Sequence, residues 1–215
     1  MCSNTVYIYL IVFALDSEFS HFLQLSTPGI SDSTLRIFDT RVSGGLVLEW
    51  RAAASLRGVH FIRCLECDIN GMWVAAGFSS GALNVLDLRI GLVMQSFRPH
   101  SADITRIISS DGNVYASSMD HNVSHWKTVK KFTDGNDPDV VLYGPKEPIL
   151  CMSLLGEDIL TCSSSRVTTY NPYKHSTCTK LRTDNFKGGV STLATLPLNK
   201  LMVLGSDTGN ISMFS

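Results

Sequence analysis

The fold of this chain is decided by the stretch Val123-Ser124-His125-Trp126-Lys127, because its pattern recurs along the sequence. Each copy has an apolar residue first, a large aromatic or aliphatic residue fourth and a polar residue fifth. The other copies are Leu35-Arg36-Ile37-Phe38-Asp39, Leu83-Asn84-Val85-Leu86-Asp87, Val167-Thr168-Thr169-Tyr170-Asn171 and Ile211-Ser212-Met213-Phe214-Ser215. Their first residues lie 48, 40, 44 and 44 positions apart. This spacing is close to the roughly 40–45 residues of a WD-type propeller blade.

The segments between the copies predict strands and tight turns rather than helices, because short β-branched runs alternate with Gly, Asn, Asp and Ser. A strand is expected before each of the last four copies, at 72–77, 113–118, 158–162 and 200–205. Another is expected before each of these, and runs such as 46–50 and 92–97 supply a fourth. We therefore predict an all-β fold, a β-propeller of WD-repeat type with four complete four-stranded blades, a partial one and an incomplete ring. A two-sheet sandwich is the alternative, but it gives no reason for the period.

The repeat also predicts how the chain is divided. We expect a propeller fragment over 25–215, with blades at about 42–88, 89–127, 128–171 and 172–215, and leave 1–24 unassigned. The copy at Leu35 lacks a convincing preceding strand. The apolar run 6–15 is too short for a membrane-spanning helix and predicts a buried strand, with a signal or anchor segment as the alternative. Because this number of blades does not close a usual ring, we expect a piece of a longer protein that aggregates or needs companion sequence.

Composition limits the classes of partner. The 215 residues include 18 Lys and Arg against 19 Asp and Glu, a net charge of −1. Such a balance excludes a strong general attraction to nucleic acid or to an acidic membrane surface. Only 17% of the residues are charged and 44% are hydrophobic. Propeller blades are covered by neighbours on both faces, which explains this apolar composition.

One predicted blade carries residues typical of the WD hydrogen-bond network, namely His100, Ser118, Asp120 and Trp126. An indole N–H, an imidazole and a carboxylate that are buried together need mutual partners, and a satisfied network specifies one packing. A catalytic Asp–His–Ser arrangement is the alternative, but no set of oxyanion donors is visible. The other blades lack the tryptophan, so packing is expected to hold them. Their repeat ends at Phe38 and Asp39, Leu86 and Asp87, Tyr170, and Phe214.

Three other motifs could carry chemistry. Cys64-x-x-Cys67 could supply half of a zinc site, but no second pair of ligands is close, and residues three apart on a strand point to opposite faces. Leu56-Arg57-Gly58 has one arginine where lipid-binding propellers have two, which favours a surface loop over a phosphoinositide site. The lysines 127, 130 and 131 predict a solvated connection. We expect no catalytic site, no metal and no cofactor.

Several short sequence segments that go beyond the generic blade pattern resemble the C-terminal WD-repeat region of the WD repeat-containing protein 81 family. Members of this family combine a BEACH domain with WD repeats. They recur in order over roughly 32–215: 76–81, Leu86-Asp87 with Arg89, Gly91-Leu92-Val93, His100 with Asp103-Ile104, Asn185-Phe186, Leu193-Ala194 with Leu196-Pro197, and 204–207 with Gly209. Residues 1–24 contain no such segment, and no BEACH region is present.

The resemblance implies a cytosolic scaffold, peripheral on endosomes or autophagosomes. Members of this family act with a second WD-repeat protein to restrain the Beclin-containing class III phosphatidylinositol 3-kinase complex, and so govern conversion of early to late endosomes. They are also linked to autophagy through cargo receptors. The implied partners are thus proteins, with indirect membrane association and no nucleic acid. A phosphoinositide-binding propeller at the endosomal membrane is the alternative.

Overall fold

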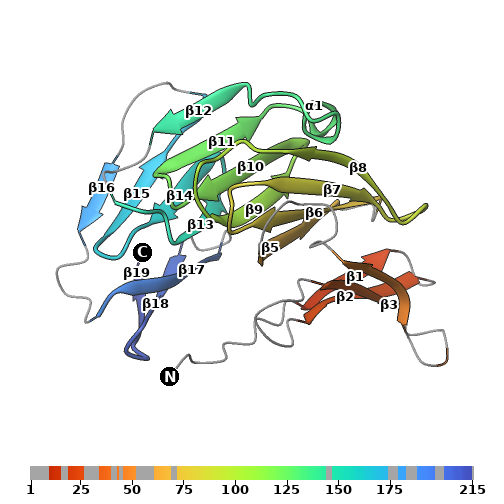
Figure 1. Ribbon diagram of the computed structural model, residues 1–215. Helices are drawn as coiled ribbons and strands as arrows, with labels where there is room; N and C mark the ends of the chain where they lie inside the picture. The colour runs from red at the N-terminus through yellow and green to blue at the C-terminus, as the bar shows by residue number, and fades with distance from the viewer. Residues whose placement is uncertain are drawn as a thin grey trace.

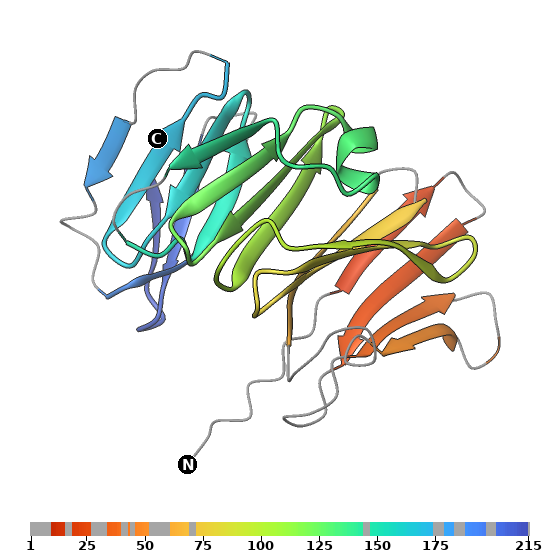
Figure 2. The same ribbon diagram turned by 45° about the horizontal axis from the view of Figure 1, so that its top comes forward.

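The computed structural model describes residues 10–15, 19–26, 34–39, 43, 46–51, 61–68, 72–143, 147–173, 179–182, 188–196 and 201–214. These residues form five antiparallel sheets that follow one another in chain order as an arc (Figure 1). Figure 2, a view turned by 45°, shows the same succession, from the sheet that begins at Leu10 to the sheet that ends at Phe214. The helix α1 (Val129–Thr133) is a single short turn of helix in an otherwise β structure.

Each sheet is a meander in which consecutive strands pair. Sheet 1 consists of β1 (Leu10–Leu15), β2 (Phe19–Ser26), β3 (Thr34–Asp39) and β4 (Leu46–Arg51). Sheet 2 consists of β5 (Ile62–Cys67), β6 (Trp73–Phe78), β7 (Leu83–Asp87) and β8 (Leu92–Phe97). Sheet 3 consists of β9 (Ile104–Ser110), β10 (Asn113–Ser118), β11 (Asn122–Trp126) and β12 (Val140–Tyr143).

The last two sheets continue this pattern. Sheet 4 consists of β13 (Cys151–Leu155), β14 (Asp158–Cys162), β15 (Arg166–Tyr170) and β16 (Thr179–Arg182). Sheet 5 has three strands among the described residues, β17 (Val190–Leu196), β18 (Leu201–Ser206) and β19 (Ile211–Phe214). The predicted four complete four-stranded units and a partial one are therefore present.

The sheets divide the chain one strand later than the predicted blade boundaries. The run 46–50 was expected to begin a blade that ends near residue 88, but β4 pairs with β3 in sheet 1. In the same way β8 pairs with β7, and β12 pairs with β11. Short connections account for the first two pairings, since six residues join β3 to β4 and ten separate β4 from β5, whereas β12 pairs with β11 across a longer connection that contains α1.

The N-terminal part of the chain also differs from expectation. The predicted lack of a strand before Leu35 is wrong, because β2 pairs with β3 from Ser26↔Thr34 to His21↔Asp39. Part of the unassigned segment 1–24 forms β1 and most of β2. Residues 10–15 of the apolar run form the expected strand, and residues 6–9 lie outside the described residues.

Sheet 2 shows how neighbouring sheets are packed. All six residues of β6 are buried, because its two faces are both covered. Val74, Ala76 and Phe78 join Leu35 and Ile37 of sheet 1 in one apolar cluster. Trp73 and Ala75 point the other way and join a cluster with sheet 3. Because successive side chains of a strand point to opposite faces, β6 packs against both sheet 1 and sheet 3.

The remaining junctions are built in the same way. Tyr115 and Val123 of sheet 3 pack against Ile149, Met152 and Ile159, which belong to sheet 4 or lie directly before it. On the other face of sheet 4, a further cluster reaches sheet 5 through Leu160, Cys162, Val167, Val190, Leu193, Met202 and Leu204. The large side chain at the fourth position of each repeat copy is explained by packing, because this position faces the preceding sheet. The residues concerned are Leu86, Trp126, Tyr170 and Phe214.

Candidate functional site

Loops and turns meet along one edge of the sheets, which we call the loop face. It consists of the segments before the first strand of a sheet and the turns between its second and third strands. In sheet 3, His100 Nδ1 lies 3.0 Å from an Asp120 carboxylate oxygen. The same carboxylate accepts hydrogen bonds from the backbone N–H groups of Ser101, at 2.9 Å, and Asn122, at 3.1 Å. One side chain therefore fixes both the loop and the turn.

The His100–Asp120 pair is buried, with 1% and 9% of the side chains exposed. Burial lowers the pKa of His100, and the Asp120 carboxylate opposes this effect only in part. The neutral imidazole is therefore the favoured form near neutral pH. Because an ionised carboxylate only accepts hydrogen bonds, Nδ1 carries the proton. Nε2 is left buried without a hydrogen-bond partner among the described residues.

Trp126 lies outside this network. Its indole N–H donates to the backbone oxygen of Asn136, at 2.8 Å. Ser118 Oγ donates to the backbone oxygen of Ala102, at 3.1 Å, and accepts from Asp120 N–H, at 3.2 Å. Ala116 of β10 lies in the same buried cluster as Trp126, but it has no hydroxyl that could accept from the indole. Of the four predicted residues the structure thus joins His100, Ser118 and Asp120, and places Trp126 in the apolar interface.

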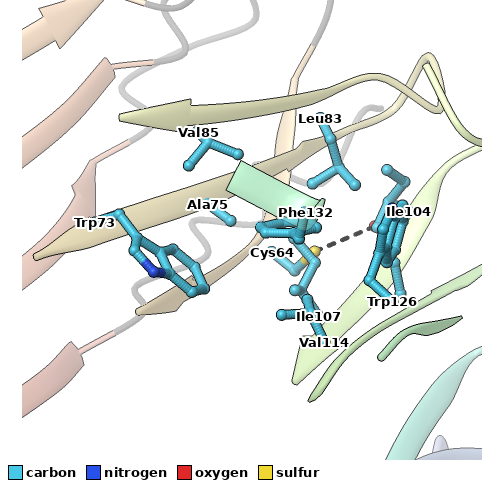
Figure 3. Close-up of a cluster of buried hydrophobic side chains, with 11 residues drawn as sticks. Cys64, Trp73, Ala75, Leu83, Val85, Ile104, Ile107, Val114, Trp126 and Phe132 are labelled. Carbon is cyan, nitrogen blue, oxygen red and sulfur yellow. Dashed lines mark hydrogen bonds between the residues drawn. The ribbon is translucent and has the colours of Figure 1, made fainter. Parts of the chain in front are cut away.

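The segment that covers Trp126 is not among the elements expected from the sequence. Lys127, Lys130 and Lys131 are exposed, as a solvated connection requires, but the same segment also contains α1, which begins after Thr128, whose Oγ1 accepts from Lys131 N–H at 3.3 Å. Phe132 is fully buried, and its ring centroid lies 5.1 Å from that of Trp126 and 5.5 Å from that of Trp73. Figure 3 shows these rings among the side chains between sheets 2 and 3. The signals in the sequence were the N-cap threonine and the following Gly135, but a five-residue helix shows no period.

Other sheets fasten their turns with different groups, contrary to the expectation that packing alone holds them. In sheet 4, Glu147 of the loop accepts hydrogen bonds from Ser163 Oγ, at 2.6 Å, and Ser165 Oγ, at 2.9 Å. These bonds, led by that from Ser163, lower the pKa of Glu147. In sheet 5, Asp207 of the turn accepts from Gly189 N–H, at 2.9 Å.

The described side chains at the ends of the repeat copies are held by apolar packing or, in the case of Asp87, by an ion pair. Leu86 is fully buried, and Phe214 packs against the cluster between sheets 4 and 5. Asp87 receives two hydrogen bonds from the Arg89 guanidinium, at 2.6 and 3.1 Å, and these bonds lower its pKa. Tyr170 packs against the cluster between sheets 3 and 4. The backbone of Phe38 and Asp39 belongs to β3, while their side chains lie outside the described residues.

Cys64 and Cys67 face opposite sides of sheet 2, as the strand period predicts. Cys64 donates to the Ile104 oxygen at 3.6 Å in the cluster with sheet 3, whereas Cys67 belongs to the cluster with sheet 1. Burial raises the pKa of Cys64 to about 12. Over the described ranges, no three His, Cys, Asp or Glu residues are placed to hold a metal ion together.

The predicted surface motifs are only partly described. Lys127 and Lys130 are exposed, and Lys131 forms an ion pair with Asp139. Leu56-Arg57-Gly58 lies outside the described residues. Within the part of the chain that the structure covers, no helix is long and apolar enough to cross a membrane.

Sequence and structural relatives agree with this architecture. WD repeat-containing protein 81 of Danio rerio is 35% identical over 191 residues, or 86% of this chain. The Homo sapiens protein of that name is 34% identical over 194 residues, or 88% of this chain. The chain is a WD-repeat homologue of WD repeat-containing protein 81. It spans only about a tenth of the length of these relatives, 9% and 10%. No family model matches the chain.

A solved structure confirms the fold that the homology to WD repeat-containing protein 81 implies. A chain in the crystal structure of the mitotic checkpoint complex superposes with a TM-score of 0.73 at 12% sequence identity. The match covers 91% of this chain and 57% of that one. With the repeated four-stranded sheets, this likeness establishes a β-propeller of WD-repeat type.

Proposed function

We propose that this chain is a non-enzymatic scaffold that binds other proteins and contributes to control of endosomal phosphatidylinositol 3-kinase activity. The observation that carries the proposal is the loop face, where His100, Asp120, Glu147 and Asp207 tie loops to turns. Loops that a rigid stack of sheets holds in place are well suited to recognition. The homology to WD repeat-containing protein 81 supports the cellular setting.

The proposed partners are those that the resemblance to this family implies. They are a second WD-repeat protein, the class III phosphatidylinositol 3-kinase complex and autophagy cargo receptors. The chain would act in the cytoplasm, peripheral on endosomes or autophagosomes, in the conversion of early to late endosomes and in autophagy. Membrane association would be indirect, through the bound proteins.

An affinity-capture experiment tests the proposal. The full chain is immobilised and incubated with purified class III kinase complex or with cytosolic extract, and retained kinase subunits are quantified. We expect retention by the unmodified chain and reduced retention by Asp120→Ala, which releases the 98–102 loop. The matched control is Glu157→Gln, because Glu157 is an exposed residue of the β13–β14 turn. The absence of any kinase subunit or endosomal component would contradict the proposal. Flotation of the chain alone with phosphatidylinositol 3-phosphate vesicles would instead favour the lipid-binding alternative.

A further inference from the structure

A pocket lies between sheets 2 and 3, at the edge where β5 ends and β6 begins and where the β7–β8 and β9–β10 turns lie. Its volume is about 610 Å³. This is within the range of about 300–1,000 Å³ typical of ligand pockets. Asp87, the last residue of one repeat copy, lines the pocket, whereas the residues that form the hydrogen bonds of the loop face do not.

Most of the apolar part of the pocket comes from sheet 2, and Val129 of α1 adds to it. Trp73 lines it together with Met72 and Met94. Each of the two methionines is 42% exposed, Met72 directly before β6 and Met94 on the edge strand β8. Methionine side chains adapt to irregular apolar groups and are frequent at binding surfaces. The pocket therefore offers apolar contact area that no neighbouring element covers among the described residues.

Asp68 adds a specific chemical requirement to the pocket. It follows β5, lines the pocket and is only 8% exposed. Its backbone N–H donates to the Trp73 oxygen, at 3.1 Å, but its carboxylate forms no ion pair and accepts no hydrogen bond among the described residues. A buried carboxylate is costly unless it is paired, so this group favours a positively charged ligand.

The other charged groups of the pocket leave this requirement unmet. Arg89 is engaged by the carboxylate of Asp87. Asp111, in the β9–β10 turn, accepts a hydrogen bond from Ser110 Oγ at 3.1 Å and adds a second carboxylate. Lys130 of α1 is exposed and is the remaining cation of the lining. With three carboxylates and two cations, the pocket has a negative balance of one charge.

We propose that this pocket binds an arginine side chain of a partner protein, flanked by apolar residues. The guanidinium would donate in its plane to the Asp68 carboxylate, a geometry that arginine matches better than lysine. Asp111 would add longer-range attraction. The flanking apolar side chains would contact Met72, Trp73 and Met94. This inference rests on the proposed scaffold function and names the chemistry of one partner segment.

A peptide titration tests the inference. The full chain is immobilised, and acetyl-Leu-Arg-Leu-amide is passed over it in a surface plasmon resonance instrument. The control peptide carries citrulline, which keeps the shape of arginine but is uncharged. We expect binding of the arginine peptide to be at least tenfold tighter than that of the citrulline peptide. Asp68→Asn should remove most of this difference, Asp111→Asn should reduce it a few-fold, and Glu157→Gln should leave it unchanged.

Equal binding of the two peptides, or an arginine preference that persists in folded Asp68→Asn, would overturn the inference. If Asp68→Asn does not fold, as judged by circular dichroism, Asp111→Asn and the citrulline peptide still decide the question. The affinity-capture experiment separates this inference from the proposed function. If the unmodified chain retains the kinase complex but shows no arginine preference, only the pocket inference fails. If the preference is present but no partner is retained, the proposed function fails.

Discussion

At the scale of single residues, Gly81 shows how closely two sheets approach at the loop face. Its φ is +81°, and a Cβ there would lie 2.2 Å from the His100 oxygen. We expect Gly81→Ala to lower the free energy of unfolding by about 3 kcal/mol or more, because backbone strain and a clash with main chain add together. Urea denaturation followed by tryptophan fluorescence measures this loss.

Gly112 provides the matched control. Its φ is +77°, yet a Cβ there would meet no atom within 4 Å. Gly112→Ala should therefore cost only the backbone strain, about 1–2 kcal/mol. Equal losses for the two variants would show that the contact between Gly81 and His100 contributes nothing.

Glu66 gives the interface between sheets 2 and 3 a dependence on pH. Its Oε1 accepts from Ser109 N–H at 2.8 Å, and burial raises its pKa from 4.5 to about 7, against the opposing effects of that bond and of Arg106. The folded chain therefore binds this proton more tightly than the unfolded chain. The stability contributed by protonated Glu66 is lost as the pH rises from 4.5 to 7.

Glu66→Gln should remove this loss while keeping an acceptor for Ser109. We expect the Tm of the variant to rise relative to that of the unmodified chain between pH 5 and pH 8. The corresponding difference in unfolding free energy is at most about 3 kcal/mol. Thermal melts at several pH values measure it, with Glu157→Gln as the control. Parallel curves for Glu66→Gln and the unmodified chain would contradict the expected titration.

At the scale of elements, α1 is a helix that one aromatic side chain holds in place. Besides the two tryptophans, Phe132 packs against Phe97, and the centroids of the two phenylalanine rings lie 5.8 Å apart. We expect Phe132→Ala to cost about 3–5 kcal/mol. Thr128→Ala, which removes only the N-cap, should cost about 1 kcal/mol. Denaturation curves of both variants test this order, and a larger loss for Thr128→Ala would show that capping rather than packing maintains the element.

The elements that could be predicted from the sequence are the middle strands, whose two faces both pack against neighbouring sheets. The ranges 113–118 and 158–162 match β10 and β14, because both faces of these strands demand apolar residues. The pairing of β4 with β3 was not predictable from spacing, since a repeat has the same period wherever it is cut. At the candidate site, the contact of His100 with Asp120 followed from residue types, but the diversion of Trp126 to Asn136 depends on how α1 packs.

At the scale of the whole molecule, sheet 5 has an apolar edge. In β19, Ile211 is 78% and Met213 is 63% exposed, and β19 pairs only with β18 among the described residues. An exposed apolar edge strand favours association with another chain. We expect the isolated chain to self-associate at micromolar concentration, and Ile211→Lys with Met213→Lys to reduce this association. Analytical ultracentrifugation distinguishes the two samples, and a monodisperse, cooperatively melting monomer of the unmodified chain would contradict the expectation.

Protection from hydrogen exchange should also vary across the molecule. The middle strands of sheets 2 and 3, β6, β7, β10 and β11, are buried almost throughout, whereas β8 and β19 are largely exposed. Backbone amides of the buried strands are expected to exchange slowest. Exchange followed by mass spectrometry tests this order, and equal protection of β7 and β8 would contradict it.

The alternating packing of the middle strands restricts where the chain can change in length. In β7, Leu83 and Val85 face sheet 3 while Leu86 faces sheet 1. Deleting one residue there would exchange the side chains presented to both neighbours, so two junctions would be damaged by a single event. The turns at Gly112 and Gly156 have open space around them. Insertions and deletions should therefore accumulate at such turns during divergence of the family, while the lengths of the middle strands remain fixed.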